Sequence, residues 1–207
     1  MRLFTYGGSA NGYKVELALR QLALPYERVE VEIFRGEAQR PDFLARNPGG
    51  RVPVLELDDG TNLVESNAIL WHVTRGTRLA PATPLDETRA IAWLSFEQNA
   101  IEPVIGSARF WRLTGRDRDR ADETARRIAQ GRRSLAELDL ALRDRPFLLG
   151  ERYSLADIAV YAYAHLAGDV GIDLADTPNV AAWCRRVEDQ PGHVAGPEPY
   201  SAPAHVA

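Results

Sequence analysis

The sequence predicts a chain with two different halves, an α/β N-terminal half followed by an all-helical C-terminal half. Strand and helix patterns alternate in the first 76 residues, whereas no convincing strand pattern follows the stretch 77–84. That stretch contains two prolines and lacks periodicity, as linkers do. We therefore expect domains at 1–76 and 85–195, a linker at 77–84, and a flexible, Pro- and Ala-rich tail at 196–207.

The N-terminal half begins with a strand at 3–6 and a loop at 7–12. Residues 15–22 carry apolar side chains at helical spacing. Residues 29–33 alternate apolar and charged side chains, the period of a half-buried strand. A short helix near 42–46, a hairpin and a further helix follow. The predicted order is therefore β-α-β followed by β-β-α.

The hairpin region contains an informative proline. Pro53 stands between a Gly-rich turn and an apolar run, so it opens a strand, where a missing N–H costs least. A Val52–Pro53 bond can be cis, and such a bond leaves the backbone of Val52 free to pair with an extended peptide. Asp59 and Gly60 predict a type I′ turn, with positive φ at both residues.

A predicted anion site follows the hairpin. Glu65 and Ser66 precede an apolar helical run, which places them at a helix N-terminus. The Ser66 hydroxyl is an expected N-cap, and several backbone N–H groups there lack helical partners. A helix start of this kind binds anions.

The C-terminal half shows two capping boxes. The first, Thr83 to Asp86, starts a long helix that reaches Ala108 and that Pro103 should bend. A second helix is expected at about 118–143. The second box, 154–157, opens a buried helix.

In this order and spacing, residues 47–69 resemble the glutathione-binding half of the glutathione S-transferase family, where a cis-proline loop is followed by Glu-Ser at a helix start. The resemblance covers nearly the whole chain. It implies a thioredoxin-like N-terminal domain, an all-α C-terminal helical domain and glutathione as cosubstrate. The family carries a similar Ser-x-x-Asp box as a folding element, to which we assign no catalytic role.

The resemblance also implies how glutathione is held. Val52, beside Pro53, would pair its backbone with the cysteinyl unit. Glu65 and Ser66 would hold the γ-glutamyl amine and carboxylate. Arg51 either binds the glycyl carboxylate or is a solvated arginine.

Two further positions depend on the same resemblance. Gln39 stands in a loop where the family often has histidine or lysine, so it offers only a neutral hydrogen bond to the glycyl end. Phe110 and Trp111 are candidates for an apolar wall around a second substrate, and the alternative is an ordinary interdomain core contact.

Thiol activation is expected in the first loop. A free thiol with a pKa of about 8.5 is only about 3% thiolate at pH 7, and the thiolate is the nucleophile. Ser9 and Asn11 lie where the family places its activating residue, so the Ser9 hydroxyl and the Asn11 amide would donate to the sulfur. The alternative is that one of them only caps the helix. Tyr6 and Tyr13 are competing hydroxyls.

Composition excludes several classes. The net charge of −4 does not suggest nucleic acid as the main partner. We see no signal peptide, no long apolar run and no metal-ligand spacing, and so expect a cytoplasmic protein without metal or membrane partners. Cys184, the single cysteine, has helical core spacing. Any thiol chemistry would therefore use an external thiol.

The leading hypothesis is a homodimeric, detoxifying glutathione transferase that acts on a small electrophile. A glutathione-dependent disulfide reductase or peroxidase would use the same residues. A maleylacetoacetate-type isomerase shares the family fold, although its usual serine-cysteine loop is missing here. A non-catalytic ligand carrier or regulatory protein would keep the fold and lose the activating donors.

Overall fold

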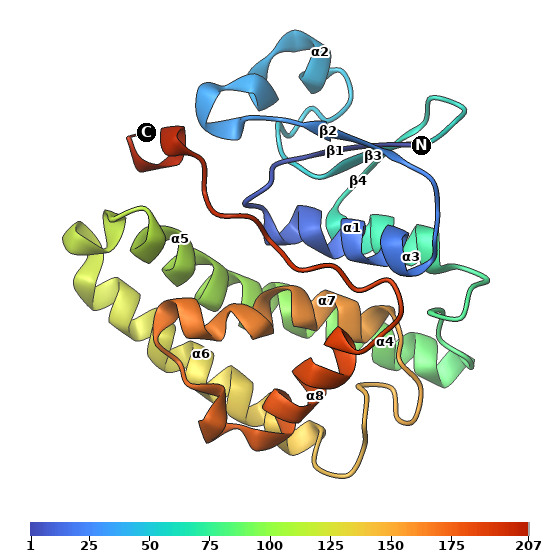
Figure 1. Cartoon of the computed structure of the whole chain (residues 1–207), viewed down its shortest axis with the longest axis vertical. Coiled ribbons are helices and arrows are strands. Elements are labelled where there is room, and N and C mark those ends of the chain that lie inside the picture. Colours follow the sequence, from blue (N-terminus) through green and yellow to red (C-terminus); the bar gives the residue numbers. More distant parts are fainter. Residues whose placement is uncertain (207) are drawn as a thin grey trace. The chain divides into compact units, whose positions relative to one another are not determined.

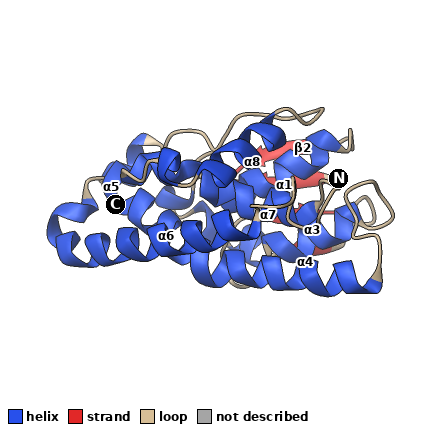
Figure 2. Ribbon diagram, turned by 90° about the horizontal axis from the view of Figure 1, so that it is seen from below, coloured by secondary structure: helices blue, strands red, loops and turns tan. Residues whose placement is uncertain are grey.

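The computed structural model describes residues 1–206 and divides them into two compact units. Unit 1 contains residues 1–75 and 191–206, and unit 2 spans Gly76–Gln190. All four strands of the sheet belong to unit 1, and unit 2 is helical (Figures 1 and 2). The predicted fold, an α/β domain followed by an all-α domain, is confirmed.

The sheet of unit 1 has the order β2-β1-β3-β4. β1 pairs with β2 in parallel and with β3 antiparallel, and β3 pairs with β4 antiparallel. This topology is the predicted β-α-β unit joined to a hairpin. The strands are β1 (Arg2–Thr5), β2 (Glu27–Glu30), β3 (Val54–Glu56) and β4 (Asn62–Val64).

Helices cover both faces of this sheet. α1 (Ala10–Gln21) and α3 (Ser66–Thr74) lie together on one face, and the short α2 (Pro41–Leu44) lies on the other (Figure 1). Because side chains alternate along a strand, Phe4 packs with Phe43 of α2, whereas the fully buried Leu3 faces the opposite side. The central strands β1 and β3 are therefore buried on both faces, whereas the edge strand β2 is largely exposed.

The second strand is shorter than the sequence predicted. Residues 29–33 were expected to be extended, yet β2 ends at Glu30 and Ile33–Arg35 form a 3₁₀ turn. The Glu32 carboxylate accepts from Phe34 N at 3.0 Å and caps that turn. A local side-chain hydrogen bond of this kind competes with strand pairing.

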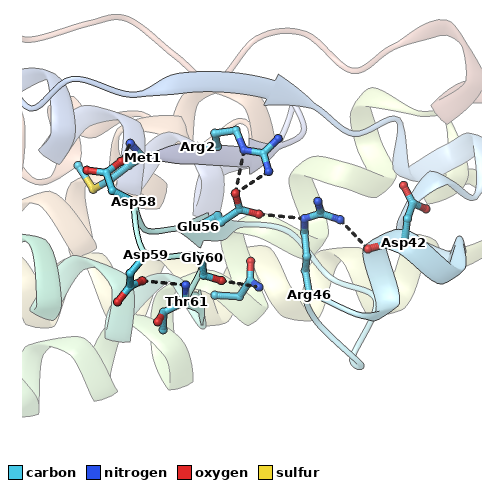
Figure 3. Close-up of polar contacts among 10 residues, drawn as sticks. Met1, Arg2, Asp42, Arg46, Glu56, Asp58, Asp59, Gly60 and Thr61 are labelled. Atoms are coloured by element: carbon cyan, nitrogen blue, oxygen red, sulfur yellow. Dashed lines mark hydrogen bonds and ion pairs between the residues drawn. The ribbon is translucent and has the colours of Figure 1, made fainter.

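The hairpin turn also differs from the prediction. Gly60 has a positive φ of 84°, but Asp59 does not share it, so the turn is not type I′. Gly60 N donates to Leu57 O at 3.0 Å, and the Asp59 carboxylate accepts from Thr61 N at 2.9 Å (Figure 3). The Asp59 side chain thus accepts a hydrogen bond from the backbone two residues further along the chain, and this bond stabilises the observed turn.

Ionic contacts join the strands beside the hairpin. Glu56 of β3 accepts from Arg2 Nε of β1 at 2.9 Å and from Arg46 Nε at 3.3 Å (Figure 3). The hydrogen bond from Arg2 is the main reason that the pKa of Glu56 lies below its usual value. These contacts connect the first strand, the hairpin and the segment after α2.

The helices predicted for the C-terminal half are confirmed in unit 2, but the first long helix is interrupted in its middle. The expected bend at Pro103 is a π-helical segment, Glu97–Gly106, which separates α4 from α5. Proline lacks the N–H that continues an α-helix, and a local π-helical register accommodates it. The helices are α4 (Pro84–Phe96), α5 (Ser107–Leu113), α6 (Ala121–Ala141), α7 (Leu155–Ala164) and α8 (Pro178–Glu188). None of the helices within residues 1–206 combines the length and apolar character required to cross a bilayer.

The C-terminal segment packs on unit 1. Glu198 N donates to Gly7 O at 2.9 Å, Ser201 N donates to the Tyr6 hydroxyl at 2.7 Å, and Ala204 is fully buried. The contacts fix where the tail lies and do not describe its motion, so the flexibility of the tail stays a prediction.

The limits of the two compact units differ from the predicted domain limits. Residues 77–84, predicted as a linker, belong to unit 2, and residues 191–195, predicted as part of the helical domain, belong to unit 1. Ala207 lies outside the described residues.

The capping box at the start of α7 is confirmed and is fully buried. Asp157 accepts from Ser154 N, Leu148 N and Trp183 Nε1, each at 2.9 Å. Burial raises the pKa of Asp157 to about 6, and the donated hydrogen bonds oppose that rise. The carboxylate therefore joins the start of α7, the preceding loop and α8.

We predict that Asp157→Ala lowers the free energy of unfolding by at least about 3 kcal/mol, because three buried donors lose their acceptor. The exposed box at α4 provides the matched control, since the Asp86 carboxylate there accepts only from the Thr83 hydroxyl within the box, at 2.8 Å. Asp86→Ala should cost about 1 kcal/mol or less. Urea denaturation measures both values, and equal losses would contradict the account.

Candidate functional site

Ser9 begins α1 and caps it. Its backbone is extended, with φ −84° and ψ 113°, and its Oγ accepts from Gly12 N at 3.1 Å. The capping interpretation is therefore confirmed. A serine that accepts one hydrogen bond still has its hydroxyl hydrogen to donate. Capping the helix and donating to a ligand are compatible roles for this side chain.

Asn11 lies in the first turn of α1, and its contacts settle the orientation of its amide. Asn11 Oδ1 is 3.2 Å from Lys14 Nζ and accepts from Ser66 Oγ at 3.0 Å. A lysine ammonium can only donate, so the atom that faces it must be the oxygen. The Nδ2 group lies on the other side of the carboxamide and has no partner among residues 1–206. It is available as a donor.

Ser66 is the first residue of α3 and is buried, but it is not the N-cap that the sequence predicted. Glu65 occupies the cap position without a side-chain cap bond. The Ser66 hydroxyl instead donates to Asn11 Oδ1 and accepts from Lys14 Nζ at 3.2 Å. The serine was assigned to the cap because local sequence cannot show this tertiary partner.

The first N–H groups of α3 have no acceptor within the helix. The first bond of the helix runs from Ile69 N to Glu65 O, at 2.9 Å. The N–H groups that precede Ile69 in the helix therefore have no intrahelical acceptor. Together with the helix dipole, they favour an anion at this end.

Glu65 has an unusual backbone, with φ 66° and ψ 111°. A positive φ costs about 1–3 kcal/mol for a residue with a side chain and is found most often at functional sites. The Glu65 carboxylate is 3.2 Å from Arg51 Nη2, and both side chains are mostly exposed. An exposed ion pair contributes little stability. The two residues that were expected to bind opposite ends of glutathione thus contact each other.

The Val52–Pro53 peptide bond is cis, one of two cis bonds in residues 1–206. Within that range, the backbone N–H and C=O of Val52 have no hydrogen-bond partner. The neighbouring loop is ordered by side chains: Asn47 Nδ2 donates to Arg51 O at 2.7 Å, and Gln39 Nε2 donates to Gly50 O at 3.3 Å. Val52 therefore presents unsatisfied backbone groups, as predicted.

The two competing tyrosine hydroxyls are engaged by the C-terminal segment. Tyr6 accepts from Ser201 N at 2.7 Å and donates to Ser201 Oγ at 3.0 Å. Tyr13 donates to Val194 O at 2.7 Å. Ser9 and Asn11 are left as the residues of the first loop with uncommitted side-chain donors.

Phe110 and Trp111 belong to α5 in unit 2, where both are half-buried. The guanidinium of Arg116 lies 4.8 Å from the Phe110 ring centre, and that of Arg127 lies 4.9 Å from the Trp111 ring. These contacts are within unit 2. The role of the two rings as a substrate wall stays a prediction.

Cys184 is buried, and burial raises the pKa of its thiol to about 12. It is therefore not a thiolate at neutral pH. In residues 1–206, no group of three or more His, Cys, Asp and Glu side chains could hold a metal ion.

Lys14 is the residue that the sequence interpretation missed. It is completely buried, and its Nζ contacts Asn11, Ser66 and Asn67. The available signal was its rarity, since it is the only lysine among 25 basic residues. This one lysine stands three positions after Asn11, on the same face of the helix.

Comparisons with known proteins agree with this architecture. The model of the glutathione S-transferase N-terminal domain matches residues 1–75, and that of the C-terminal domain matches residues 121–186. A maleylacetoacetate isomerase from Pseudomonas aeruginosa is 30% identical over 100% of this chain and 96% of its own. The disulfide-bond oxidoreductase YfcG from Escherichia coli is 29% identical over 90% of this chain and 89% of its own.

Solved structures show the same similarity. The crystal structure of a glutathione S-transferase from Pseudomonas fluorescens has a TM-score of 0.91 at 42% identity, covering 94% of this chain and 97% of that one. The structure of Ure2p in complex with glutathione has a TM-score of 0.82 at 25% identity, covering 92% and 90%. With two matching domain models and full-length relatives, this chain belongs to the glutathione S-transferase family.

Proposed function

We propose that this protein is a glutathione transferase, which binds glutathione and activates its thiol for attack on a small electrophile. The observation that carries the proposal is the contact between Asn11 and Ser66. This contact joins Asn11 to the first residue of α3, where the N–H groups of the helix start would take an anion. A γ-glutamyl peptide whose carboxylate binds at α3 would thus bring its thiol near Ser9 and Asn11.

The peptide would be held by groups that the structure leaves available. The free backbone of Val52, beside the cis bond to Pro53, would pair with the cysteinyl unit. The backbone N–H of Ser66, whose hydroxyl hydrogen is already donated to Asn11, would take the γ-glutamyl carboxylate together with the N–H groups that follow it, and Glu65 would take the amine.

At the glycyl end we propose Arg51 and Gln39, whose contacts are weak enough to exchange for a carboxylate. Arg51 is in an exposed ion pair with Glu65, and Gln39 makes a hydrogen bond of 3.3 Å. The cationic guanidinium of Arg51 and the neutral amide of Gln39 can both donate hydrogen bonds to a terminal carboxylate. Phe110 and Trp111 would form the apolar wall for the second substrate.

The energetic requirement on the first loop is modest. Lowering the thiol pKa from about 8.5 to about 6.5 needs about 2.7 kcal/mol of preferential stabilisation of the thiolate. One hydrogen bond to a charged group contributes about 1.5–3 kcal/mol. The Ser9 hydroxyl and the Asn11 amide together can therefore supply it without a metal or a protein thiol.

A second candidate is glutathione-dependent reduction of disulfides or peroxides. The similarity to a disulfide-bond oxidoreductase over 90% of the chain favours it. Because Cys184 is buried with a pKa raised to about 12, such chemistry would use glutathione thiols alone. Glutathione thiolate would attack one sulfur of the disulfide, and the other sulfur would leave as a thiolate. A non-catalytic role as a glutathione or ligand carrier is the third reading.

We also propose a cytoplasmic homodimer with a detoxifying role, on the basis of family membership. Two-fold dimers are the commonest closed assemblies of soluble proteins. Light scattering on the purified chain measures the mass directly.

The first test concerns thiol activation. Replacing Ser9 and Asn11 together by Ala should return the thiol pKa of bound glutathione toward about 8.5. Thiolate absorbance during a pH titration measures this pKa. Tyr6→Phe should leave that pKa unchanged, because the Tyr6 hydroxyl is bonded to the C-terminal segment. Thr83→Ala controls for the loss of a helix cap. An unaltered titration in the double variant would remove the assigned role of the loop.

The second test separates strain from binding at Glu65. Glu65→Gly should raise the stability by about 1 kcal/mol, because glycine adopts the positive φ without strain. The same variant should bind glutathione more weakly, since the carboxylate is lost. Glu65→Ala loses the carboxylate and keeps the strain, so it should bind weakly without the gain. Calorimetric titration and urea denaturation provide both values, and unweakened binding by Glu65→Gly would refute the proposed contact.

The third test identifies the reaction. An aryl halide, a small mixed disulfide and an organic hydroperoxide are offered with glutathione under matched conditions. The transferase proposal expects conjugation of the aryl halide to dominate and to fall at least about tenfold in the Ser9 and Asn11 double variant. Turnover of the disulfide alone would favour the reductase, and glutathione binding without any turnover would favour the carrier.

A further inference from the structure

Polar side chains without partners gather where the start of α6 meets Trp111 of α5. The two helices pack against each other within unit 2 (Figure 1). The guanidinium carbons of Arg120 and Arg127 lie 5.4 Å and 4.9 Å from the centre of the indole ring. Thr124 stands four positions after Arg120 and three before Arg127, so the three side chains share one face of α6.

The Thr124 hydroxyl is buried and unsatisfied. Thr124 is 6% exposed, and its Oγ1 has no hydrogen-bond partner among residues 1–206. A threonine in a helix can donate to the carbonyl four positions back, as Thr74 does to Leu70 O at 2.8 Å, but Thr124 does not. Burying a hydroxyl without a hydrogen bond is unfavourable, so the position needs an explanation. A ligand with an acceptor atom would supply the missing bond.

Two N–H donors accompany this hydroxyl. Arg127 donates one Nη group to Pro103 O and the other to Glu123 Oε1 at 3.1 Å, whereas its Nε group is buried and has no partner within residues 1–206. Trp111 Nε1 also lacks a partner in that part of the chain. An arginine Nε and an indole nitrogen can only donate. The cluster therefore calls for an acceptor, which is the property of an anion.

The charges around the cluster define the class of anion. Glu123 pairs with Arg127, whereas Arg120 has no ion pair within residues 1–206. Asp119 and Asp122 are exposed and contact no cation in that range, so solvent and salt screen them. One guanidinium without a counter-ion matches a singly charged group, and its planar fork matches a carboxylate. A monocarboxylate fits better than a doubly charged phosphate.

Arg120 also provides access to the buried atoms. Its side chain is exposed, and within residues 1–206 it makes no hydrogen bond, no ion pair and no ring contact other than that with Trp111. It occupies the cap position of α6 without a side-chain cap bond. Such a side chain can turn without breaking a polar bond. A carboxylate paired with it can thus reach Thr124 and Arg127.

We propose that the cluster of Trp111, Arg120, Thr124 and Arg127 binds a carboxylate of the second substrate, so that the protein selects electrophiles that carry one. The inference rests on the proposed transferase function, in which Trp111 belongs to the apolar wall for that substrate. Arg120 pairs with the carboxylate, and Thr124 Oγ1 and Arg127 Nε donate to it. The indole ring contacts the apolar body of the ligand.

Binding is tested first, without glutathione, so that the result does not depend on turnover. The probes are a dinitrobenzoate, which has no leaving group, and the corresponding dinitrobenzamide, which has the same shape without the charge. Calorimetric titration of the full chain should show at least about tenfold tighter binding of the dinitrobenzoate, since a hydrogen bond to a charged group contributes that much. Equal affinities for the two compounds would overturn the inference.

Thr124→Val locates the binding, because it replaces the hydroxyl by a methyl group of the same size. The affinity for dinitrobenzoate should fall at least about tenfold, since a donor to the carboxylate is lost. The urea midpoint of the free protein should rise, because a buried hydroxyl without a partner is removed. Thr124→Ser keeps the hydroxyl and should keep the affinity. Wild-type affinity in Thr124→Val would remove the hydroxyl from the site.

Selectivity is measured with a chlorodinitrobenzoate and the uncharged chlorodinitrobenzene. Glutathione thiolate displaces chloride from the ring of each compound. The ratio of kcat/KM, charged over neutral, should fall at least about tenfold in Arg120→Met, because the carboxylate loses its cation. Comparing ratios between variants cancels the difference in intrinsic reactivity. Arg126→Met is the matched control, since it removes the same charge at an exposed position of α6 outside the shared face, and it should keep the wild-type ratio.

The outcomes separate the inference from the proposed function. If the wild-type protein conjugates both compounds and folded Arg120→Met keeps the wild-type ratio, the proposed function stands and the carboxylate site is overturned. If the wild-type protein conjugates neither compound, the proposed function fails, and the binding titrations still decide whether the cluster holds a carboxylate. Circular dichroism confirms that each variant is folded.

Discussion

The hydrogen bond from Ser66 Oγ at the start of α3 to Asn11 Oδ1 on α1 is the contact on which the candidate site depends. It joins two segments that are 55 residues apart in sequence. Lys14 contacts both side chains, and because it can only donate, it fixes which atom of Asn11 faces inward. This cluster fixes how the side chains at the start of α1 are oriented toward the first residue of α3. With it, an uncommitted amide donor and a helix N-terminus are presented by one rigid pair of helices.

Features set by local physical chemistry could be predicted from the sequence. Pro53 marked the start of β3 because a proline is tolerated there, and Ser154 marked the start of α7 because its side chain and Asp157 satisfy the first N–H groups. The sheet topology followed from the order of short periodic segments. Where a local hydrogen bond competed with the pattern, as at Glu32 and Asp59, the boundary or turn type was wrong.

Features that need tertiary partners were out of reach. Ser66 was assigned as a cap because its partner lies on another helix, and no residue adjacent to Lys14 in the sequence indicates that its side chain is buried. The contacts of Tyr6 with Ser201 are separated by 195 residues, so no periodicity could reveal them. For the candidate site, the residue types were predictable and their mutual hydrogen bonds were not.

Family membership points to glutathione as the thiol compound but does not specify the reaction. The relatives include an isomerase and a disulfide-bond oxidoreductase, so one family fold accompanies different reactions. Both reactions proposed for this chain use the glutathione thiolate as the nucleophile. The central claim is therefore that Ser9 and Asn11 lower the thiol pKa of bound glutathione. Its most direct test is a pH titration of thiolate absorbance for glutathione bound to the wild-type protein. The account predicts a midpoint at least about one unit below the free value of about 8.5, whereas a midpoint equal to that of free glutathione would contradict it.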